Sequence, residues 1–207
     1  MKVLLINGSP HEKGCTYTAL KEVAKALNEG QIETEIFWIG SRPLAGCMSC
    51  MGCRSKGSCV LEDTVNEAAV KLDEADGIVV GSPVHYAAAS GQITSFLDRL
   101  FYSNGGKLAY KPGAAVVSCR RGGASAAFDQ LNKYFTINSM PIVSSQYWNQ
   151  VHGNTPEEVM EDGEGMQTMR TLGRNMAWLL QSLEAGRKAG VTIPAPEERI
   201  HTNFIRN

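Results

Sequence analysis

The sequence lacks any apolar run close to the roughly 20 residues that a membrane-spanning helix requires, and it lacks an excess of either charge. Its 207 residues carry a formal net charge of −1, so no broad basic field attracts nucleic acid or an anionic membrane. The first ten residues, MKVLLINGSP, lack the long apolar core of a signal peptide. We therefore expect a cytoplasmic protein that binds neither nucleic acid nor membrane.

Two nucleotide-binding fingerprints are also missing from the first loop, GSPHEKGCT, residues 8–16. It holds no Gly-x-Gly-x-x-Gly, and no Gly-Lys-Ser/Thr closes a Walker loop. The loop does lead into a helix, where the hydroxyls of Ser9, Thr16 and Thr18 stand beside backbone N–H groups. Such groups suit one phosphate, although an ordinary turn with Thr16 as the helix N-cap fits the same pattern.

Strand and helix patterns alternate along the chain. Apolar runs predict five strands, at 2–8, 32–40, 77–83, 113–119 and 141–148. Helical spacing of apolar residues predicts helices at 18–30, 62–76, 91–103, 124–138 and 164–186, the second with Asp63 or Thr64 as its N-cap. This alternation predicts one α/β unit with a parallel sheet and helices on both faces. Ligands of such sheets bind beyond the carboxyl ends of the strands.

Two further loops follow the third and fourth strands. In GSPVHYAAASGQ, residues 81–92, a proline and small residues precede a helix, and His85 and Tyr86 supply aromatic faces. In SCRRGGASAAF, residues 118–128, two glycines permit close backbone approach beside two arginines. Taken alone, the first is also a plain loop of small residues, and the arginine pair is also a solvated surface.

In this order, the motifs INGSPHEKGCT, DGIVVGSPVHYAAASGQITSFLDR and the Gly-Gly loop after VVSC resemble the NADPH-dependent FMN reductase branch of the flavodoxin-like fold. The resemblance runs from residue 2 to about residue 145. It implies a flavodoxin-like, doubly wound, five-stranded parallel sheet in the order 2-1-3-4-5. It also implies one FMN-binding domain over residues 1–190, with a cysteine loop at 44–62 and a tail at 191–207.

In proteins of this family the first loop binds the FMN phosphate, and the other two hold the isoalloxazine ring. Carried onto this sequence, the resemblance assigns the phosphate to Ser9, His11, Cys15, Thr16 and Thr18. It assigns the ring to Pro83, Val84, His85, Tyr86, Ser118, Arg120, Gly122 and Gly123. His11 and Cys15 depart from the family pattern, which usually has arginine and asparagine there. A helix N-terminus would lower the pKa of Cys15, but we favour the interpretation that this small residue fills space against the phosphate.

Four of the six cysteines fall in one short segment, GCMSCMGCRSKGSC, as Cys47, Cys50, Cys53 and Cys59. Disulfides are disfavoured in the cytoplasm, and four-cysteine zinc sites usually have two separated Cys-x2-Cys pairs. The compact spacing favours an iron–sulfur cluster, and an empty site remains an alternative. The segment resembles that of iron–sulfur flavoproteins, a subgroup that holds a 4Fe–4S cluster beside FMN. Cys119 ends a predicted buried strand and is interpreted as core.

The resemblance implies an FMN-dependent oxidoreductase that takes electrons from NAD(P)H or an electron carrier and passes them to an acceptor. The alternatives are a cluster-free NAD(P)H-dependent reductase of quinones, nitro or azo compounds, and a flavodoxin-like carrier or redox sensor with no substrate of its own. The partners implied are a small-molecule or protein donor and acceptor, and a second copy of the chain in a homodimer or homotetramer. Because FMN carries the chemistry, no catalytic side chain is assigned.

Overall fold

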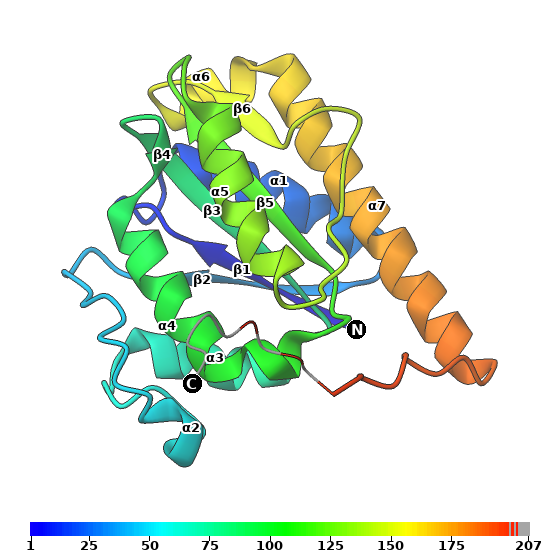
Figure 1. Cartoon of the computed structure of the whole chain (residues 1–207). Helices are drawn as coiled ribbons and strands as arrows, with labels where there is room; N and C mark the ends of the chain where they lie inside the picture. The colour runs from blue at the N-terminus through cyan, green and yellow to red at the C-terminus, as the bar shows by residue number, and fades with distance from the viewer. Residues whose placement is uncertain (199, 201, 203–207) are drawn as a thin grey trace.

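The computed structural model describes residues 1–198, 200 and 202, and a six-stranded sheet lies at its centre (Figure 1). Five strands are parallel in the order β2-β1-β3-β5-β6. They are β1 Lys2–Asn7, β2 Glu33–Trp38, β3 Gly77–His85, β5 Gly113–Cys119 and β6 Gln150–His152. The short β4, Ala88–Ala89, pairs antiparallel with the end of β3. The predicted α/β class and parallel strand order are confirmed, and β4 is an addition.

Helices cover both faces of the sheet (Figure 1). Their bounds are α1 Cys15–Glu29, α2 Cys53–Lys56, α3 Thr64–Asp73, α4 Gly91–Leu108, α5 Ala124–Thr136, α6 Pro156–Glu161 and α7 Gly163–Lys188. Successive residues of a strand point to opposite faces. Leu4 and Ile6 of β1 therefore share a core with α3, α4 and α5, whereas Val3 and Leu5 share one with α1 and α7. Both faces are apolar, as a doubly covered sheet requires.

The predicted fifth strand at 141–148 is wrong, because the edge strand β6 begins two residues later. Within that range the chain makes only one bridge to β5, from Ile142 to Gly113. It then leaves the sheet in a turn, in which the Ser145 hydroxyl donates to the carbonyl of Tyr147 at 2.6 Å. It returns at Asn149, whose side chain donates to the carbonyl of Ala115 at 3.0 Å.

Helix α4 continues past the predicted end at residue 103 through Asn104-Gly105-Gly106 to Leu108. Glycines usually weaken a helix interior, but here one is required by packing. A Cβ on Gly105 would overlap the side-chain amide of Asn138, which follows α5. Tertiary contact therefore outweighs the low helix propensity of this segment.

Within residues 1–198, 200 and 202, every helix is too short or too polar to cross a bilayer. The predicted tail begins at Val191, after α7 ends. Ile193, Pro194 and Pro196 line a pocket together with residues of α4 and α5. Positions 199, 201 and 203–207 of the predicted tail lie outside the described residues.

Candidate functional site

The loop between β1 and α1 is fixed by hydrogen bonds within the chain. Ser9 is buried, and its hydroxyl accepts from the backbone N–H of His11 at 3.1 Å. Its carbonyl accepts from the indole Nε1 of Trp38 at 2.8 Å. Asn7 holds the loop from the strand end, with Oδ1 accepting from Ser9 N at 3.2 Å and Nδ2 donating to the carbonyl of Glu12 at 2.9 Å. His11 is exposed on the outside of this loop.

The structure joins the first and third predicted loops through a pair of buried hydroxyls. Thr16 Oγ1 lies 2.8 Å from Ser118 Oγ, and both side chains are almost fully buried. Thr16 is therefore not the helix N-cap, which is Gly14. Thr18 faces back along the helix and donates to the carbonyl of Gly14 at 3.2 Å.

Helix α1 begins at this loop without a side-chain cap from the described residues, and its first turn holds no acidic residue. By contrast, α3, α4, α6 and α7 are capped by Asp63, Ser90, Thr155 and Asp162. The first N–H groups of a helix need acceptors and carry partial positive charge. The first N–H groups of α1 thus have no side-chain cap among the described residues.

The loops after β3 and β5 touch each other. Gly123, the N-cap of α5, has φ +85°, and a Cβ there would lie 2.6 Å from Ala87 Cα and 3.0 Å from Val84 Cγ1. Only glycine permits both this conformation and this contact. Tyr86 and Ala87 also have positive φ, 48° and 59°. Non-glycine residues adopt this region at some energetic cost, and such positions cluster at ligand sites.

The rim of these loops is open. Tyr86 reaches 106% relative exposure, so its ring stands clear of its own chain. His85, Arg120 and Gly122 are also exposed, while Pro83 and Val84 are half-buried beneath them. Most of the predicted ring-binding residues thus form an accessible shelf at the carboxyl edge of the sheet, whereas Ser118 is buried against Thr16.

Cys15 does not have the lowered pKa that its position predicts. Burial raises the pKa of its thiol, outweighing the hydrogen bond from its own backbone, and the carboxylates of Glu158 and Glu157 raise it further. Its sulfur lies 3.7 Å from the carbonyl of Gly153, which follows β6. Cys15 therefore packs between α1 and the edge strand, in agreement with the interpretation that it fills space. Cys119 is buried, as its interpretation as core requires.

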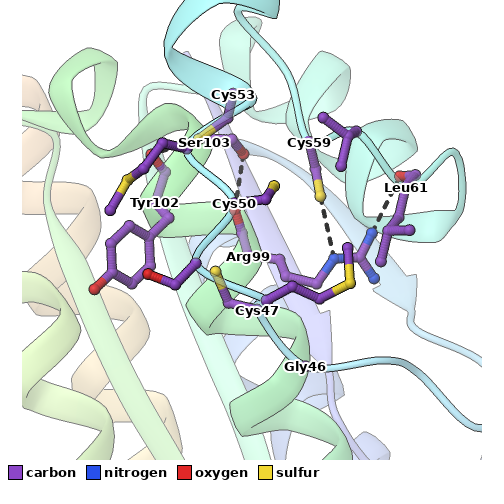
Figure 2. A pocket seen from close by; sticks show the side chains of 13 residues that line it. Gly46, Cys47, Cys50, Cys53, Cys59, Leu61, Arg99, Tyr102 and Ser103 are labelled. Carbon is purple, nitrogen blue, oxygen red and sulfur yellow. Dashed lines mark hydrogen bonds between the residues drawn. The ribbon is translucent and has the colours of Figure 1, made fainter.

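The four clustered cysteines line one pocket against the side of α4 (Figure 2). Cys47 and Cys50 are exposed, Cys53 and Cys59 are half-buried, and all are free thiols. Cys53 Sγ lies 3.8 Å from the carbonyl of Tyr102 on α4. Among the described residues, no three histidine, cysteine or acidic side chains already stand close enough to hold a metal ion.

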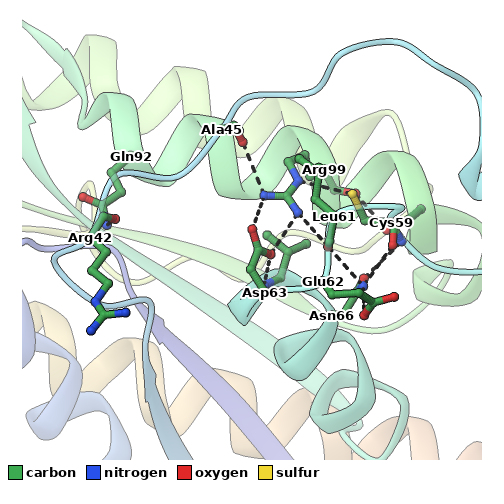
Figure 3. A network of polar contacts seen from close by, with 11 residues as sticks. Arg42, Ala45, Cys59, Leu61, Glu62, Asp63, Asn66, Gln92 and Arg99 are labelled. Atoms are coloured by element: carbon green, nitrogen blue, oxygen red, sulfur yellow. Dashed lines mark hydrogen bonds and ion pairs between the residues drawn. The ribbon is translucent and has the colours of Figure 1, made fainter.

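Arg99 of α4 anchors this segment from beneath (Figure 3). Its Nε donates to Cys59 Sγ at 3.2 Å, and its two terminal nitrogens reach Asp63 at 2.7 and 2.9 Å. It also donates to the carbonyls of Leu61 at 3.1 Å and Ala45 at 3.4 Å. Burial lowers the pKa of Arg99, but the hydrogen bonds to Asp63 and Cys59 outweigh it, so the pKa lies above its ordinary value.

Asn66 of α3 provides a second anchor. Its Oδ1 accepts from the backbone N–H of Cys59 at 3.1 Å, and its Nδ2 donates to the Cys59 carbonyl at 2.9 Å. Sequence reasoning missed both Arg99 and Asn66 as parts of the site. A signal for Arg99 was present, because it falls three residues after Phe96 on the apolar face of α4, where a charged residue requires partners.

A model of the family described as NADPH-dependent FMN reductase matches residues 1–155. Two curated relatives are named iron–sulfur flavoproteins. One, from Methanocaldococcus jannaschii, is 33% identical over 192 residues, covering 89% of this chain and 100% of the relative. The other, from Methanosarcina thermophila, is 30% identical over 191 residues, covering 90% of this chain and 99% of the relative.

Among solved structures, a WrbA-like flavodoxin from Agrobacterium tumefaciens superimposes with a TM-score of 0.61 at 17% identity. The match covers 87% of this chain and 96% of that one. This likeness shows the fold alone.

Proposed function

Because the chain belongs to the NADPH-dependent FMN reductase family and to its iron–sulfur flavoprotein subgroup, we propose that it transfers electrons from NAD(P)H or an electron carrier to an acceptor through bound FMN and a 4Fe–4S cluster. The family and its relatives make the chain an FMN-dependent oxidoreductase. The observation that carries the proposal is the meeting of three loops at one sheet edge, around the uncapped N-terminus of α1.

FMN fits this edge. The open N–H groups of α1 would receive the phosphate, with the hydroxyls of Ser9, Thr16 and Thr18 and with His11 and Cys15 around it. The ring would lie on the shelf made by Pro83, Val84, His85, Tyr86, Ser118, Arg120, Gly122 and Gly123. Arg120 is exposed there, so its charge is available to the electron-rich edge of the ring. When bound, FMN supplies the redox chemistry, and the protein orients the ring and sets its electrostatic surroundings.

The cysteine pocket fits a cluster in its donor set. Four thiolates are the usual ligands of a 4Fe–4S cluster, and Cys47, Cys50, Cys53 and Cys59 all line one pocket. Since no three of these side chains stand close enough to hold a metal ion among the described residues, we propose that the segment closes when the cluster is assembled. Arg99 and Asn66 hold the Cys59 end in place, so the closing movement belongs to the Cys47–Cys53 end.

We further propose that residues 1–190 act as one FMN-binding domain and that the protein works as a homodimer or homotetramer, since the exposed Tyr86 shelf would gain cover from a partner subunit. The six free thiols support a reducing compartment such as the cytoplasm.

A second candidate is a reductase without a cluster, acting on quinones, nitro or azo compounds. The observation that favours it is the separation of the four sulfurs within the described residues. In that case the cysteine segment would have only a structural role, and Arg99 would serve as its anchor.

Anaerobic reduction of the FMN-loaded protein tests the proposed activity. NADPH or NADH should bleach the flavin absorbance, and a quinone should then restore it. If reduced ferredoxin bleaches the flavin but neither nucleotide does, the protein takes its electrons from an electron carrier and is not an NAD(P)H oxidoreductase. Failure of the protein to bind FMN at all would contradict both.

A further inference from the structure

Arg99 is the largest of the fully buried side chains, with 2% relative exposure. It lies in the wall of the cysteine pocket, in the middle of α4 (Figure 2). A buried guanidinium is costly unless its charge and its donors are all satisfied. Its place beneath a cysteine segment therefore calls for a more specific reason than filling space.

The fork of the guanidinium divides its donors between two kinds of partner. The terminal nitrogens form a two-point ion pair with Asp63 and bond two carbonyls, which accounts for a structural anchor. The remaining donor, Nε, points at a sulfur, Cys59 Sγ, at 3.2 Å. A lysine has one compact head in place of a rigid fork, so it would not reach Asp63 and Cys59 together.

The charged groups around Arg99 leave its contact with Cys59 Sγ electrostatically significant. Among residues 1–198, 200 and 202, Asp63 is its one carboxylate partner, with a side chain 30% exposed against 1% for Arg99. Cys59 is one of the four proposed cluster ligands, and as a ligand its sulfur carries negative charge. The geometry thus places a permanent cation and a directed N–H on one ligand sulfur of the proposed cluster.

We propose that Arg99 is a positioning residue that holds Cys59 as a cluster ligand and raises the reduction potential of the cluster. This inference rests on the proposed function. Hydrogen bonds to ligand sulfurs and local net charge both set the potentials of iron–sulfur clusters. A cation beside the sulfur favours the reduced state, which carries one more negative charge, over the oxidised state.

The test is an anaerobic redox titration of the reconstituted, FMN-loaded protein and of three variants, R99Q, R99K and R42Q. Arg42 is the matched control, since it lies in the segment that leads to the cysteines, it is exposed, and its side chain points away from Arg99 (Figure 3). The FMN potential, read in the same titration, is the internal control. Iron and FMN contents are measured for each protein.

In R99Q we expect a roughly tenfold shift of the cluster equilibrium toward the oxidised form, which is a fall of about 59 mV for a one-electron couple. R99K should fall by less, because it keeps the charge and loses the directed Nε–H bond. R42Q should match the unmodified protein, and the FMN potential should be the same in all four. A purely structural anchor would leave the potential unchanged.

A cluster of full iron content whose potential is the same in R99Q, R99K and the unmodified protein would overturn the inference and leave the proposed function standing. If R99Q loses its iron or does not fold, the test rests on R99K, which retains a cation opposite Asp63. A cluster potential lower in R99K than in the unmodified protein supports the inference, and an unchanged potential overturns it. Absence of iron from the unmodified protein after reconstitution would remove the cluster and this inference together.

Discussion

Two hydroxyls connect the loops of the flavin site at the scale of single residues. The Thr16 and Ser118 oxygens lie 2.8 Å apart although the residues are 102 positions apart in the chain. Each hydroxyl can donate one hydrogen bond and accept others. Either one can therefore keep the loops together while the other donates to an anion at the N-terminus of α1.

Replacing Thr16 with valine keeps the shape of the side chain and removes its hydroxyl. If the hydroxyl donates to the FMN phosphate, the loss of one charge-assisted hydrogen bond should weaken FMN binding about tenfold. Fluorescence titration of FMN into the apoprotein measures the effect. T168V is the matched control, since Thr168 is a buried threonine on α7 that donates to the Glu164 carbonyl. Equal FMN affinities in T16V and T168V would contradict the assignment.

The chemistry of the flavin loops could be read from the chain, because hydroxyls, glycines and aromatics follow one strand after another. The role of Arg99 could not. Its place on the apolar face of α4 indicates only that it requires partners, and its main partner, Asp63, lies 36 positions earlier in the chain. Only the folded chain brings this pair, the Leu61 carbonyl and the Cys59 sulfur to one place.

At the scale of elements, the beginnings of the helices divide into two groups. Those capped by their own chain are α3, α4, α6 and α7, whereas α1 and α5 start at glycines that offer no side-chain cap. Among the uncapped helices, α1 and α5 follow β1 and β5 at the flavin edge, and the third, the four-residue α2, lies in the cysteine segment. An N-cap residue stabilises a helix by about 1 kcal/mol, so the chain forgoes that stabilisation where the proposed ligand binds.

Gly14→Asp should therefore have opposite effects on stability and binding. Gly14 has φ −87° and ψ −162°, which any residue adopts, and a Cβ there would approach only the exposed His11 closely, at 3.1 Å. Aspartate should raise the free energy of unfolding of the apoprotein by about 1 kcal/mol. It should also weaken FMN binding at least tenfold, by placing a second anion against the phosphate.

Urea unfolding of the apoprotein and FMN titration measure the two effects. Gly14→Ser is the control, since it adds a cap without a charge and should weaken FMN binding less than aspartate does. A G14D protein that binds FMN as tightly as the unmodified one would exclude the N-terminus of α1 as the phosphate site.

Most helices and strands could be predicted from the sequence, since apolar periodicity indicates buried strands and helices. The strand predicted at 141–148 failed for a physical reason. Its residues include β-branched and aromatic side chains that favour strands. However, Tyr147 and Trp148 are half exposed and pack against each other with tilted rings, whose centroids lie 4.9 Å apart. The continuous ladder with β5 starts only at Gln150, a polar residue with a weak strand signal.

At the scale of the whole molecule, α4 connects the two proposed cofactor sites. Its N-cap Ser90 donates to the carbonyl of Gly8 at 3.0 Å, in the first flavin loop. Arg99 follows nine residues later, about 13 Å along the helix axis at 1.5 Å per residue. One rigid helix thus fixes the cysteine pocket relative to the flavin edge.

The edge strand β2 holds a charge that serves stability. Glu35 of β2 accepts from Lys2 of β1 at 2.8 Å and from Lys71 of α3 at 2.6 Å. These two hydrogen bonds keep the pKa of Glu35 below its ordinary value. A lowered pKa in the folded state gives stability that is present above the unfolded value and is lost as pH falls through the folded one.

Between pH 7 and about pH 3, the unmodified protein should therefore lose more stability than E35Q, by at most about 1 kcal/mol for such a surface cluster. At pH 7 the two proteins should bind FMN equally, since Glu35 lies away from the carboxyl edge of the sheet. Urea unfolding across this pH range, with FMN titration at pH 7, checks both statements. Equal pH dependence of unfolding in the two proteins would show that the ion pairs of Glu35 with Lys2 and Lys71 contribute nothing to stability. Weaker FMN binding by E35Q would contradict the statement that Glu35 lies away from the flavin site.

The central claim is that this chain holds FMN and a 4Fe–4S cluster together, and the most direct measurement is the iron, sulfide and FMN content of protein purified without oxygen, with its visible spectrum. We predict one FMN and about four irons per chain, with iron lost and FMN kept in C50S, and both kept in the control C119A, whose cysteine is buried outside the pocket. Bound FMN with no iron and four free thiols, even after anaerobic reconstitution, would contradict the cluster and leave a plain FMN-dependent reductase.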